Sequence, residues 1–245
     1  MSRQAGNWLV VGSSGSGKSH YLNDLLTAYT GRYRYLVVVN ASNELSEHCA
    51  HSEYVGLEKL SRAYSPEGLA ALIRTHGSVF FELAPTGAEA FLDTLGEAVM
   101  SLGEYDTDEC QVLLVLDEAR HWVTKGAMPA GLERCEAEGR KYGIDIIKAT
   151  QRLGSSSQDT IDLAAVAQVT RVVIFPLAEL NQRRRLMEMF PDLPDSATLK
   201  RPVPEKGWGG EYLVWDVLAG RGACVRRGPD GSRHLEDVDN ETIHA

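Results

Sequence analysis

Residues 12–19 hold the combination of side chains that most directly indicates chemistry. They read Gly-Ser-Ser-Gly-Ser-Gly-Lys-Ser and fit the pattern G-x-x-x-x-G-K-[ST] at every fixed position. Glycines let the backbone curl until successive N–H groups point at phosphate oxygens, and the helix that follows adds the positive end of its dipole. The lysine supplies a point charge to the β- and γ-phosphates, and the final hydroxyl ligates Mg²⁺. The segment therefore predicts a site for a nucleoside triphosphate with its magnesium ion.

We expect nine consecutive residues to bind the nucleotide, ATP: Gly12, Ser13, Ser14, Gly15, Ser16, Gly17, Lys18, Ser19 and His20. Among them, the Lys18 ammonium is expected to act in catalysis and the Ser19 hydroxyl to hold the metal. A Gly/Ser turn that matches by chance is the alternative. The context argues against it, because an apolar strand-like run at 8–11 precedes the loop and an amphipathic helix follows it.

Two carboxylates after the apolar run at residues 112–116 form a second candidate feature. Asp117, at the tip of this predicted strand, is placed to hold the metal through its water shell. Glu118 follows, where a carboxylate can polarise a water molecule for in-line attack on the γ-phosphate. A plain strand-ending turn is the alternative. Because a kinase acting on a metabolite needs no water-activating base here, Glu118 favours nucleotide hydrolysis.

A glutamine follows another apolar run, at residues 144–149, in the sequence Thr150-Gln151-Arg152. Its amide can hydrogen-bond the terminal phosphate or the attacking water, so we interpret Gln151 as a sensor of the γ-phosphate. Capping of the next loop is the alternative. Together with Lys18 and Glu118, Gln151 completes the catalytic set that these patterns predict.

The elements that carry these residues alternate between strand-like and helical patterns, which indicates an α/β fold with a mostly parallel sheet. Several runs are apolar at consecutive positions, as in strands covered on both faces. Strands are predicted at residues 8–11, 35–39, 79–83, 112–116, 144–149 and 171–175. In sequence, the run at 79–83 lies between the strand before the phosphate loop and the acidic strand, so there is room for an extra strand.

Helices are predicted after the phosphate loop, over about 88–102, and after Pro176, the last one with Leu177, Leu180, Leu186, Met187 and Met189. A loop with Pro191, Pro194, Pro202 and Pro204 precedes a predicted β-hairpin of residues 212–215 and 223–225. We predict one P-loop ATPase domain over 1–245, with a nucleotide-binding core at 1–176, a C-terminal helix and hairpin at 177–228, and a flexible tail at 229–245.

Composition narrows the class of protein. Hydrophobic residues make up 43% and charged residues 24%, which excludes a mainly disordered chain, a collagen-like repeat and a coiled coil. No stretch approaches the roughly 20 apolar residues that span a bilayer, and no secretory signal is recognisable. We therefore expect a soluble cytoplasmic protein without direct membrane insertion. The four cysteines form no CxxC pair and predict free thiols.

Three segments together resemble the FtsK–HerA superfamily of hexameric DNA-pumping ATPases: GSSGSGKS at 12–19, LLVLDEAR at 113–120 and GRKYGIDIIKATQR at 139–152. The block from 112 to 152 is the most specific part. Residues 172–194 and 210–216 resemble the C-terminal part of the same proteins, so the similarity spans most of the chain. With no preceding transmembrane region or β-barrel and no winged helix after it, the chain is most similar to genome-packaging ATPases of tailless, membrane-containing double-stranded DNA viruses.

The resemblance implies a RecA-like P-loop NTPase fold and an ATP-driven translocase that packages double-stranded DNA into a preformed capsid. It assigns Walker A roles to Gly12, Gly17, Lys18 and Ser19, Walker B roles to Asp117 and Glu118, and the sensor role to Gln151. The expected cofactors are ATP and Mg²⁺. The expected partners are double-stranded DNA, further copies of the chain in a ring, expected to be a hexamer, and capsid vertex proteins. The expected location is the host cytoplasm or a packaging vertex of the virion.

Family members form rings in which an arginine of one subunit reaches the γ-phosphate bound by its neighbour. Arg140, within GRKYG, is the first candidate for this catalytic arginine. Arg134, on the same predicted helix, is the second. A solvated charge on a helix surface is the alternative for both. In other P-loop enzymes such an arginine accelerates hydrolysis by about 10³–10⁵-fold.

Weaker patterns remain open. Arg183, Arg184 and Arg185 are adjacent on a predicted helix and do not share one face, so a DNA-facing or interface role competes with a solvated helix surface. The run Glu47-His48-Cys49-Ala50-His51 has close spacing but no second cluster nearby, which makes a zinc site a poor interpretation. His121 and Trp122, just after the acidic pair, are candidates either for packing the site or for lining a pore.

Other function classes compete with the translocase. The alternatives are a cellular HerA- or FtsK-like DNA pump, a P-loop small-molecule kinase, a GTPase switch and a non-enzymatic nucleotide-binding scaffold. The GTPase is disfavoured because the sequence contains no Asn-Lys-x-Asp guanine-reading motif. The net charge of −9 argues against DNA binding, since proteins that track phosphates usually show basic surfaces. A ring resolves this conflict if it turns a few Lys and Arg side chains into its channel.

Overall fold

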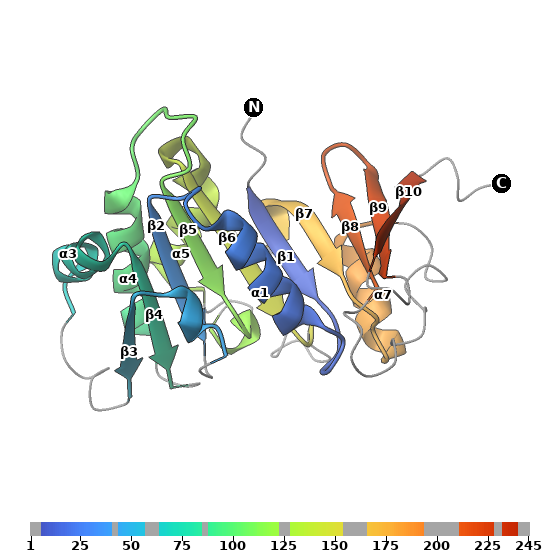
Figure 1. Ribbon diagram of the computed structural model, residues 1–245, viewed down its shortest axis with the longest axis horizontal. Helices are drawn as coiled ribbons and strands as arrows, with labels where there is room; N and C mark the ends of the chain where they lie inside the picture. The colour runs from blue at the N-terminus through green and yellow to red at the C-terminus, as the bar shows by residue number, and fades with distance from the viewer. Residues whose placement is uncertain are drawn as a thin grey trace.

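The computed structural model describes residues 6–40, 44–56, 64–84, 88–122, 128–153, 166–193, 211–227 and 232–239. All described strands belong to one sheet, in the order β10-β9-β8-β7-β1-β6-β5-β2-β4-β3 (Figure 1). The strands are β1 (Asn7–Val11), β2 (Tyr35–Asn40), β3 (His51–Val55), β4 (Ser78–Leu83), β5 (Val112–Leu116), β6 (Ile144–Thr150), β7 (Val169–Ile174), β8 (Tyr212–Asp216), β9 (Arg221–Arg227) and β10 (Arg233–Asp239).

The sheet is parallel from β7 to β3 and antiparallel from β8 to β10. This confirms the predicted mostly parallel sheet and the C-terminal hairpin, which β8 and β9 form. The hairpin continues into β10, whose residues pair with β9 from Arg233↔Arg227 to Asp239↔Arg221. The segment predicted as a flexible tail therefore contains a strand at Arg233–Asp239, a mostly polar stretch that adds a third antiparallel strand to the hairpin.

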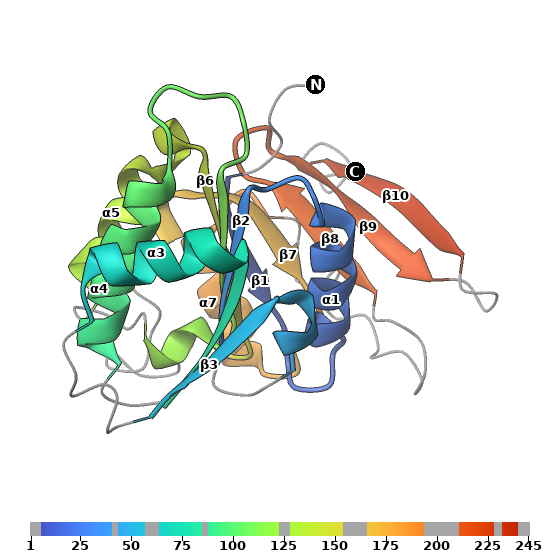
Figure 2. The same cartoon turned by 60° about the vertical axis from the view of Figure 1, so that its left-hand side comes forward.

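The described helices are α1 (Lys18–Tyr29), α3 (Pro66–His76), α4 (Glu89–Leu102), α5 (Ala130–Glu138) and α7 (Leu180–Met189), with 3₁₀ turns η1 (Ser46–His48), η2 (Ala119–His121) and η3 (Gly139–Tyr142). Helix α1 lies on one face of the sheet, and α3, α4 and α5 lie on the other (Figure 2). Among these described helices, none combines the length and the apolar character that a membrane crossing requires.

The larger core lies between the sheet and the layer of α3, α4 and α5, and α7 contributes Leu186 to it. Helices α4 and α5 approach closely because glycines face each other at their crossing: a Cβ on Gly96 would lie 2.2 Å from the carbonyl carbon of Gly131. A buried ion pair, Lys148 to Glu136 at 2.6 Å, joins β6 to α5. The smaller core is formed where α1 buries Leu22 and Leu26 against the opposite face.

Two helix predictions need correction. Helix α7 begins at Leu180, so Leu177 precedes it, although Leu177 is buried in the same core. Arg134 and Arg140 do not share one helix, because α5 ends at Glu138 and Arg140 lies in the 3₁₀ turn η3. Of the proline-rich loop, Pro194, Pro202 and Pro204 lie outside the described residues.

The strand order decides which residues meet. Strands β1, β6, β5 and β2 are neighbours and run parallel, so their carboxyl ends share one edge of the sheet. The strand that separates β1 from the acidic strand β5 is β6, and the run at 79–83 forms β4 on the far side of β2. A strand does lie between the strand of the phosphate loop and the acidic strand, but it is β6, which Gln151 directly follows, and not the run at 79–83. Loops at the carboxyl edge of such a sheet are where ligands usually bind.

Candidate active site

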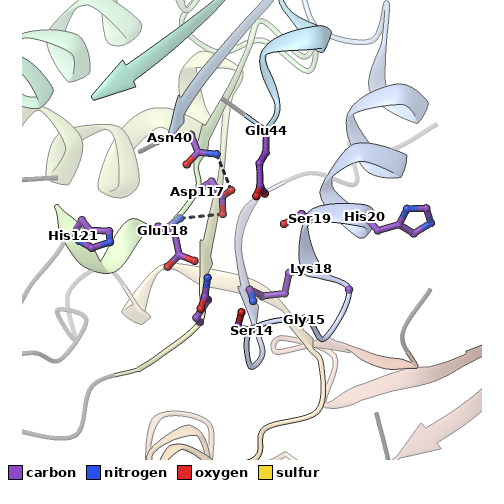
Figure 3. A pocket seen from close by; sticks show the side chains of 12 residues that line it. Ser14, Gly15, Lys18, Ser19, His20, Asn40, Glu44, Asp117, Glu118 and His121 are labelled. Atoms are coloured by element: carbon purple, nitrogen blue, oxygen red, sulfur yellow. Dashed lines mark hydrogen bonds between the residues drawn. The ribbon is translucent and has the colours of Figure 1, made fainter. Parts of the chain in front are cut away.

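A cavity of 790 Å³ opens at the carboxyl edge, where the loops after β1, β6, β5 and β2 meet. Its lining residues are Ser14, Gly15, Gly17, Lys18, Ser19, His20, Asn40, Glu44, Asp117, Glu118, His121 and Gln151. The phosphate loop, the acidic pair and the glutamine, which lie far apart in the chain, thus surround one space. Figure 3 shows Asp117 and Glu118 on one side of the cavity and Lys18 and Ser19 on the other, with the imidazole of His20 directed away.

The phosphate loop owes its shape to its glycines. Gly15 and Gly17 adopt positive φ angles of 72° and 101°, which side chains with a Cβ rarely tolerate. Helix α1 begins at Lys18 with no side-chain cap and no acidic residue in its first turn. Its first N–H groups and the positive end of its dipole therefore point into the cavity, in an arrangement that binds anions.

The loop is fixed to the neighbouring strands. Gly12 donates its N–H to the Thr150 carbonyl (3.3 Å), and Ser13 donates its N–H to the Pro176 carbonyl (3.2 Å). Gly12 has no room for a side chain, because a Cβ there would lie 2.4 Å from the Cβ of Phe175. Gly12 and Ser13 are thus held against the ends of β6 and β7, while the cavity is lined by Ser14, Gly15, Gly17, Lys18 and Ser19.

Lys18 places its ammonium group inside this curl of backbone. Its Nζ donates hydrogen bonds to the carbonyls of Gly12 (2.8 Å) and Ser13 (3.2 Å), and the residue is only 7% exposed. Burial lowers the pKa of Lys18, and the carboxylates of Glu118 and Asp117 act in the opposite direction. The two carboxylates therefore help to keep a positive charge on Lys18 at the place where phosphates would bind.

Asp117 is a buried carboxylate with two fixed hydrogen bonds. Its Oδ2 accepts a bond from the Asn40 amide (3.0 Å), and its Oδ1 accepts one from the Glu118 N–H (3.0 Å). Burial, and next the charge of Glu118, raise the pKa of Asp117 to about 6. A cation bound beside it would relieve the cost of this ionised, poorly solvated group, as expected for a metal ligand.

Replacing Asp117 by Asn should stabilise the fold at about pH 8 by up to about 3 kcal/mol, because burial makes the ionised carboxylate costly. The folded protein keeps this proton up to about pH 6, whereas the unfolded chain releases it near pH 3.8. The wild-type free energy of unfolding therefore falls, relative to the variant, as pH rises through this window. Urea unfolding of both proteins at about pH 5 and about pH 8 tests this. A gap that does not widen with pH would contradict the assignment.

Glu118 is held in an unusual backbone conformation. Its φ of 54° and ψ of 41° lie in the left-handed region, which glutamate seldom adopts. Directly before it, the Asp117 N–H continues the β5 pairing by donating to the Val39 carbonyl (2.9 Å). The chain therefore turns sharply at Glu118, and this turn brings a second carboxylate to the cavity beside the first.

Gln151 reaches the cavity from the end of β6. The Thr150 hydroxyl braces the following turn, because it donates to the Arg152 carbonyl (2.8 Å) and accepts from the Arg152 N–H (3.3 Å). A hydrogen bond from the Leu153 N–H to the Gln182 amide oxygen (2.6 Å) fixes the chain two residues after Gln151. The glutamine thus lies on a short segment whose backbone is held on both sides.

Two residues that line the cavity, Asn40 and Glu44, were not predicted from the sequence. Asn40, fully buried, ends β2 and binds Asp117, while Glu44 lies nearby in the lining. A signal for Asn40 existed, since it is a polar residue directly after the apolar run at 35–39. Without knowledge that β2 lies next to β5, that signal could not be connected to Asp117.

Some predicted site residues do not line this cavity. Three residues of the phosphate loop are absent from the lining: Gly12, Ser13 and Ser16. Ser16 is buried inside the loop and is only 2% exposed. Arg140 precedes β6, so it lies near the amino edge of the sheet, opposite the cavity. Arg134 pairs with Glu97 at 2.8 Å on the outer side of α5. Any contact of either arginine with a nucleotide would have to come from another subunit.

The weaker patterns have mixed outcomes. Within the described ranges, which include His48, Cys49 and His51, no group of three His, Cys, Asp or Glu residues is arranged to hold a metal ion. His121 lines the cavity, whereas the buried Trp122 packs in the larger core. Arg183, Arg184 and Arg185 all lie on α7, as predicted.

The donor set fits magnesium with a bound triphosphate. Mg²⁺ is usually held by one or two protein oxygens together with phosphates and water, and needs no cage of carboxylates. The Ser19 hydroxyl and the Asp117 carboxylate both line the cavity and would provide those oxygens. The position of these two oxygens in one cavity favours a cation there, and the burial that raises the pKa of Asp117 acts in the same direction.

No family model and no curated protein matches this sequence. Solved structures do match. The genome packaging NTPase B204 of Sulfolobus turreted icosahedral virus 2, in complex with AMPPCP, has a TM-score of 0.63 at 14% identity, over 90% of this chain and 96% of that one. VirB4 of Thermoanaerobacter pseudethanolicus has a TM-score of 0.60 at 12% identity, over 86% of both chains.

A third match, EssC (ATPases 2 and 3) of Geobacillus thermodenitrificans, has a TM-score of 0.52 at 12% identity, over 97% of this chain and 40% of that one. Identities this low show a shared fold. The matches confirm the predicted α/β fold with a mostly parallel sheet.

Proposed function

We propose that this chain is an ATP-hydrolysing double-stranded DNA translocase that packages a viral genome into a preformed capsid. The observation that carries the proposal is the single cavity that the phosphate loop, the acidic pair and Gln151 line together. The likeness to a viral genome packaging NTPase along 96% of its length supports the packaging role.

Binding would begin at the amino end of α1. The backbone N–H groups around Gly15 and Gly17 surround the β-phosphate, and the Lys18 ammonium moves from the loop carbonyls to the β- and γ-phosphate oxygens. Ser19 and Asp117 would hold Mg²⁺, which supplies positive charge to the phosphate oxygens. The loop backbone and the Asp117 carboxylate are already held in place before the nucleotide arrives, so the movement of Lys18 is the main reorganisation that binding requires.

Hydrolysis would depend on Glu118 and Gln151. The Glu118 carboxylate accepts a proton from a water molecule while the oxygen of that water attacks the γ-phosphorus. The bond between the γ-phosphorus and the oxygen that bridges it to the β-phosphate breaks, and ADP and inorganic phosphate are released. The Gln151 amide orients that water or the γ-phosphate. Such a base contributes about 10²–10⁴-fold to the rate.

The motor would work as a homo-oligomeric ring, expected to be a hexamer, at a capsid vertex, either in the host cytoplasm or on the virion. Arg140, or else Arg134, would reach the γ-phosphate bound by the neighbouring subunit. The net charge of −9 is compatible with DNA binding if the ring places its Lys and Arg side chains toward the channel.

ATP turnover should rise when double-stranded DNA is added, and this stimulation should fall steeply with salt because phosphate contacts release counterions. The assay compares hydrolysis with and without DNA over a series of salt concentrations, with Lys18→Ala as the inactive control. An ATP hydrolysis rate that does not change on addition of DNA, even when the capsid vertex proteins are present, would refute the proposal of a translocase.

A cellular HerA- or FtsK-like DNA pump is the second candidate, because proteins of non-viral origin, EssC of Geobacillus thermodenitrificans and VirB4 of Thermoanaerobacter pseudethanolicus, share this fold. The two candidates share the chemistry and differ in partner. Binding of the ring to empty capsids carrying their vertex proteins, but not to capsids without them, would select the packaging motor.

A further inference from the structure

One segment of the chain, residues 176–182, contacts both the phosphate loop and the loop that carries Gln151. Its Pro176 carbonyl accepts the Ser13 N–H (3.2 Å), and its Ala178 N–H donates to the Ser13 hydroxyl (3.0 Å). At its other end, the Gln182 amide oxygen accepts the Leu153 N–H at 2.6 Å. The segment thus joins the phosphate loop to the loop that carries Gln151.

The contact between Gln182 and Leu153 is buried and directional. Gln182 is 3% exposed and Leu153 is fully buried. Because a backbone N–H can only donate, the amide of Gln182 must present its oxygen to this loop. A buried N–H without an acceptor is costly, so the hydrogen bond holds the Leu153 backbone at one place relative to α7.

The position of this bond matters because Leu153 lies two residues after Gln151. Thr150, just before Gln151, is fixed as the last residue of β6. Gln151 therefore sits on a short span that is fixed at one end by the sheet and by the Thr150 hydroxyl, which bonds the Arg152 backbone (2.8 and 3.3 Å), and at the other end by Gln182. The exposed contact between Arg152 and Glu179 at 3.9 Å is too long and too solvated to replace this constraint.

We infer that Gln182 is a positioning residue for hydrolysis, which holds the Gln151 amide at the γ-phosphate through the Leu153 backbone. This inference rests on the proposed ATP hydrolysis and deepens it. Gln182 does not line the cavity, so it would not contact a nucleotide bound there. Its loss should therefore lower kcat and leave the KM for ATP nearly unchanged, since the phosphate loop still binds the triphosphate.

The test uses three substitutions in the full chain. Gln182→Leu keeps the side-chain volume but removes the acceptor, and kcat should fall about 10- to 100-fold, as small misplacements of catalytic groups do. Gln182→Glu keeps an acceptor oxygen in either protonation state, and should restore most of the rate. Asn181→Ala, at the exposed neighbouring position on α7, is the matched control and should behave as wild type.

A double-mutant cycle with Gln151→Ala separates positioning from general stability. If Gln182 acts through Gln151, adding Gln182→Leu to Gln151→Ala lowers kcat no further. An equal loss in both backgrounds, or a wild-type kcat for folded Gln182→Leu, would overturn the inference. Should Gln182→Leu fail to fold, Gln182→Asn, whose shorter side chain withdraws the acceptor, takes its place in the cycle.

Amide hydrogen exchange gives a readout that needs no hydrolysis. Residues 151–153 should exchange faster in Gln182→Leu than in wild type or Asn181→Ala, and unchanged exchange would refute the constraint itself. If the wild-type protein hydrolyses no ATP while Gln182→Leu still exchanges faster at residues 151–153, the proposed function is refuted and the geometric part of the inference stands.

Discussion

Replacing Glu118 by Gln should lower kcat for ATP hydrolysis by about 10²–10⁴-fold, because the amide cannot accept a proton from the attacking water. ATP binding should stay close to that of wild type, since Gln has nearly the same shape and the phosphate loop is untouched. Hydrolysis is measured by phosphate release, and binding by titration with a fluorescent ATP analogue.

This substitution also separates the competing functions. A nucleotide-binding scaffold would keep its function in the Glu118→Gln variant, and a small-molecule kinase would keep its phosphoryl transfer, because neither needs water activated at this position. A wild-type rate of ATP hydrolysis in folded Glu118→Gln would remove Glu118 from the proposed mechanism. Lys18→Ala, which disturbs phosphate binding itself, serves as the comparison.

Replacing Arg140 by Ala should reduce hydrolysis by about 10³–10⁵-fold, the effect of arginine fingers in other P-loop enzymes. Arg140 lies in the exposed turn η3 near the amino edge of the sheet, away from the cavity of its own chain. Its effect would therefore arise only in a ring, where it meets the nucleotide of a neighbour. The exposed Lys141 next to it provides a matched control, and Lys141→Ala should retain activity.

Mixing two inactive variants tests whether the site is shared. Arg140→Ala subunits keep an intact phosphate loop, and Lys18→Ala subunits keep an intact arginine, so mixed rings should recover part of the wild-type activity. If the mixture stays inactive while Arg134→Ala and Lys18→Ala subunits complement each other, Arg134 is the shared residue. If no pair complements, neither arginine acts between subunits.

Most of the residues that line the cavity could be predicted because their signals are local. The phosphate loop shows its glycines and lysine in eight consecutive positions, and the acidic pair follows a strand whose predicted bounds match β5 residue for residue. A buried strand that ends in a polar residue is visible in the sequence without any knowledge of its neighbours. Gln151 at the end of β6 was found in the same way.

What the sequence did not reveal depends on long-range pairing. Nothing in residues 144–150 shows that β6 lies between β1 and β5, and this order is what brings Gln151 between the phosphate loop and Asp117. Asn40 was missed for the same reason. Strand β3 was missed because it lies at the sheet edge with alternating exposure, and its polar residues resemble a loop.

Helix α3 had a signal that the sequence analysis did not use. Ser65 precedes Pro66, and its hydroxyl accepts the N–H of Gly68 (3.0 Å), which is the usual start of a helix. Strand β10 had no comparable signal, because residues 233–239 are mostly polar and only the pairing with β9 identifies them as a strand.

A structure of the protein with Mg²⁺ and a non-hydrolysable ATP analogue tests the central claim most directly. We expect the triphosphate at the amino end of α1, with the Lys18 amine on its outer phosphates, the metal between Ser19 and Asp117, and the Glu118 carboxylate and Gln151 amide facing the γ-phosphorus. An analogue bound in a different cavity, or a γ-phosphate that none of these side chains approaches, would contradict the account.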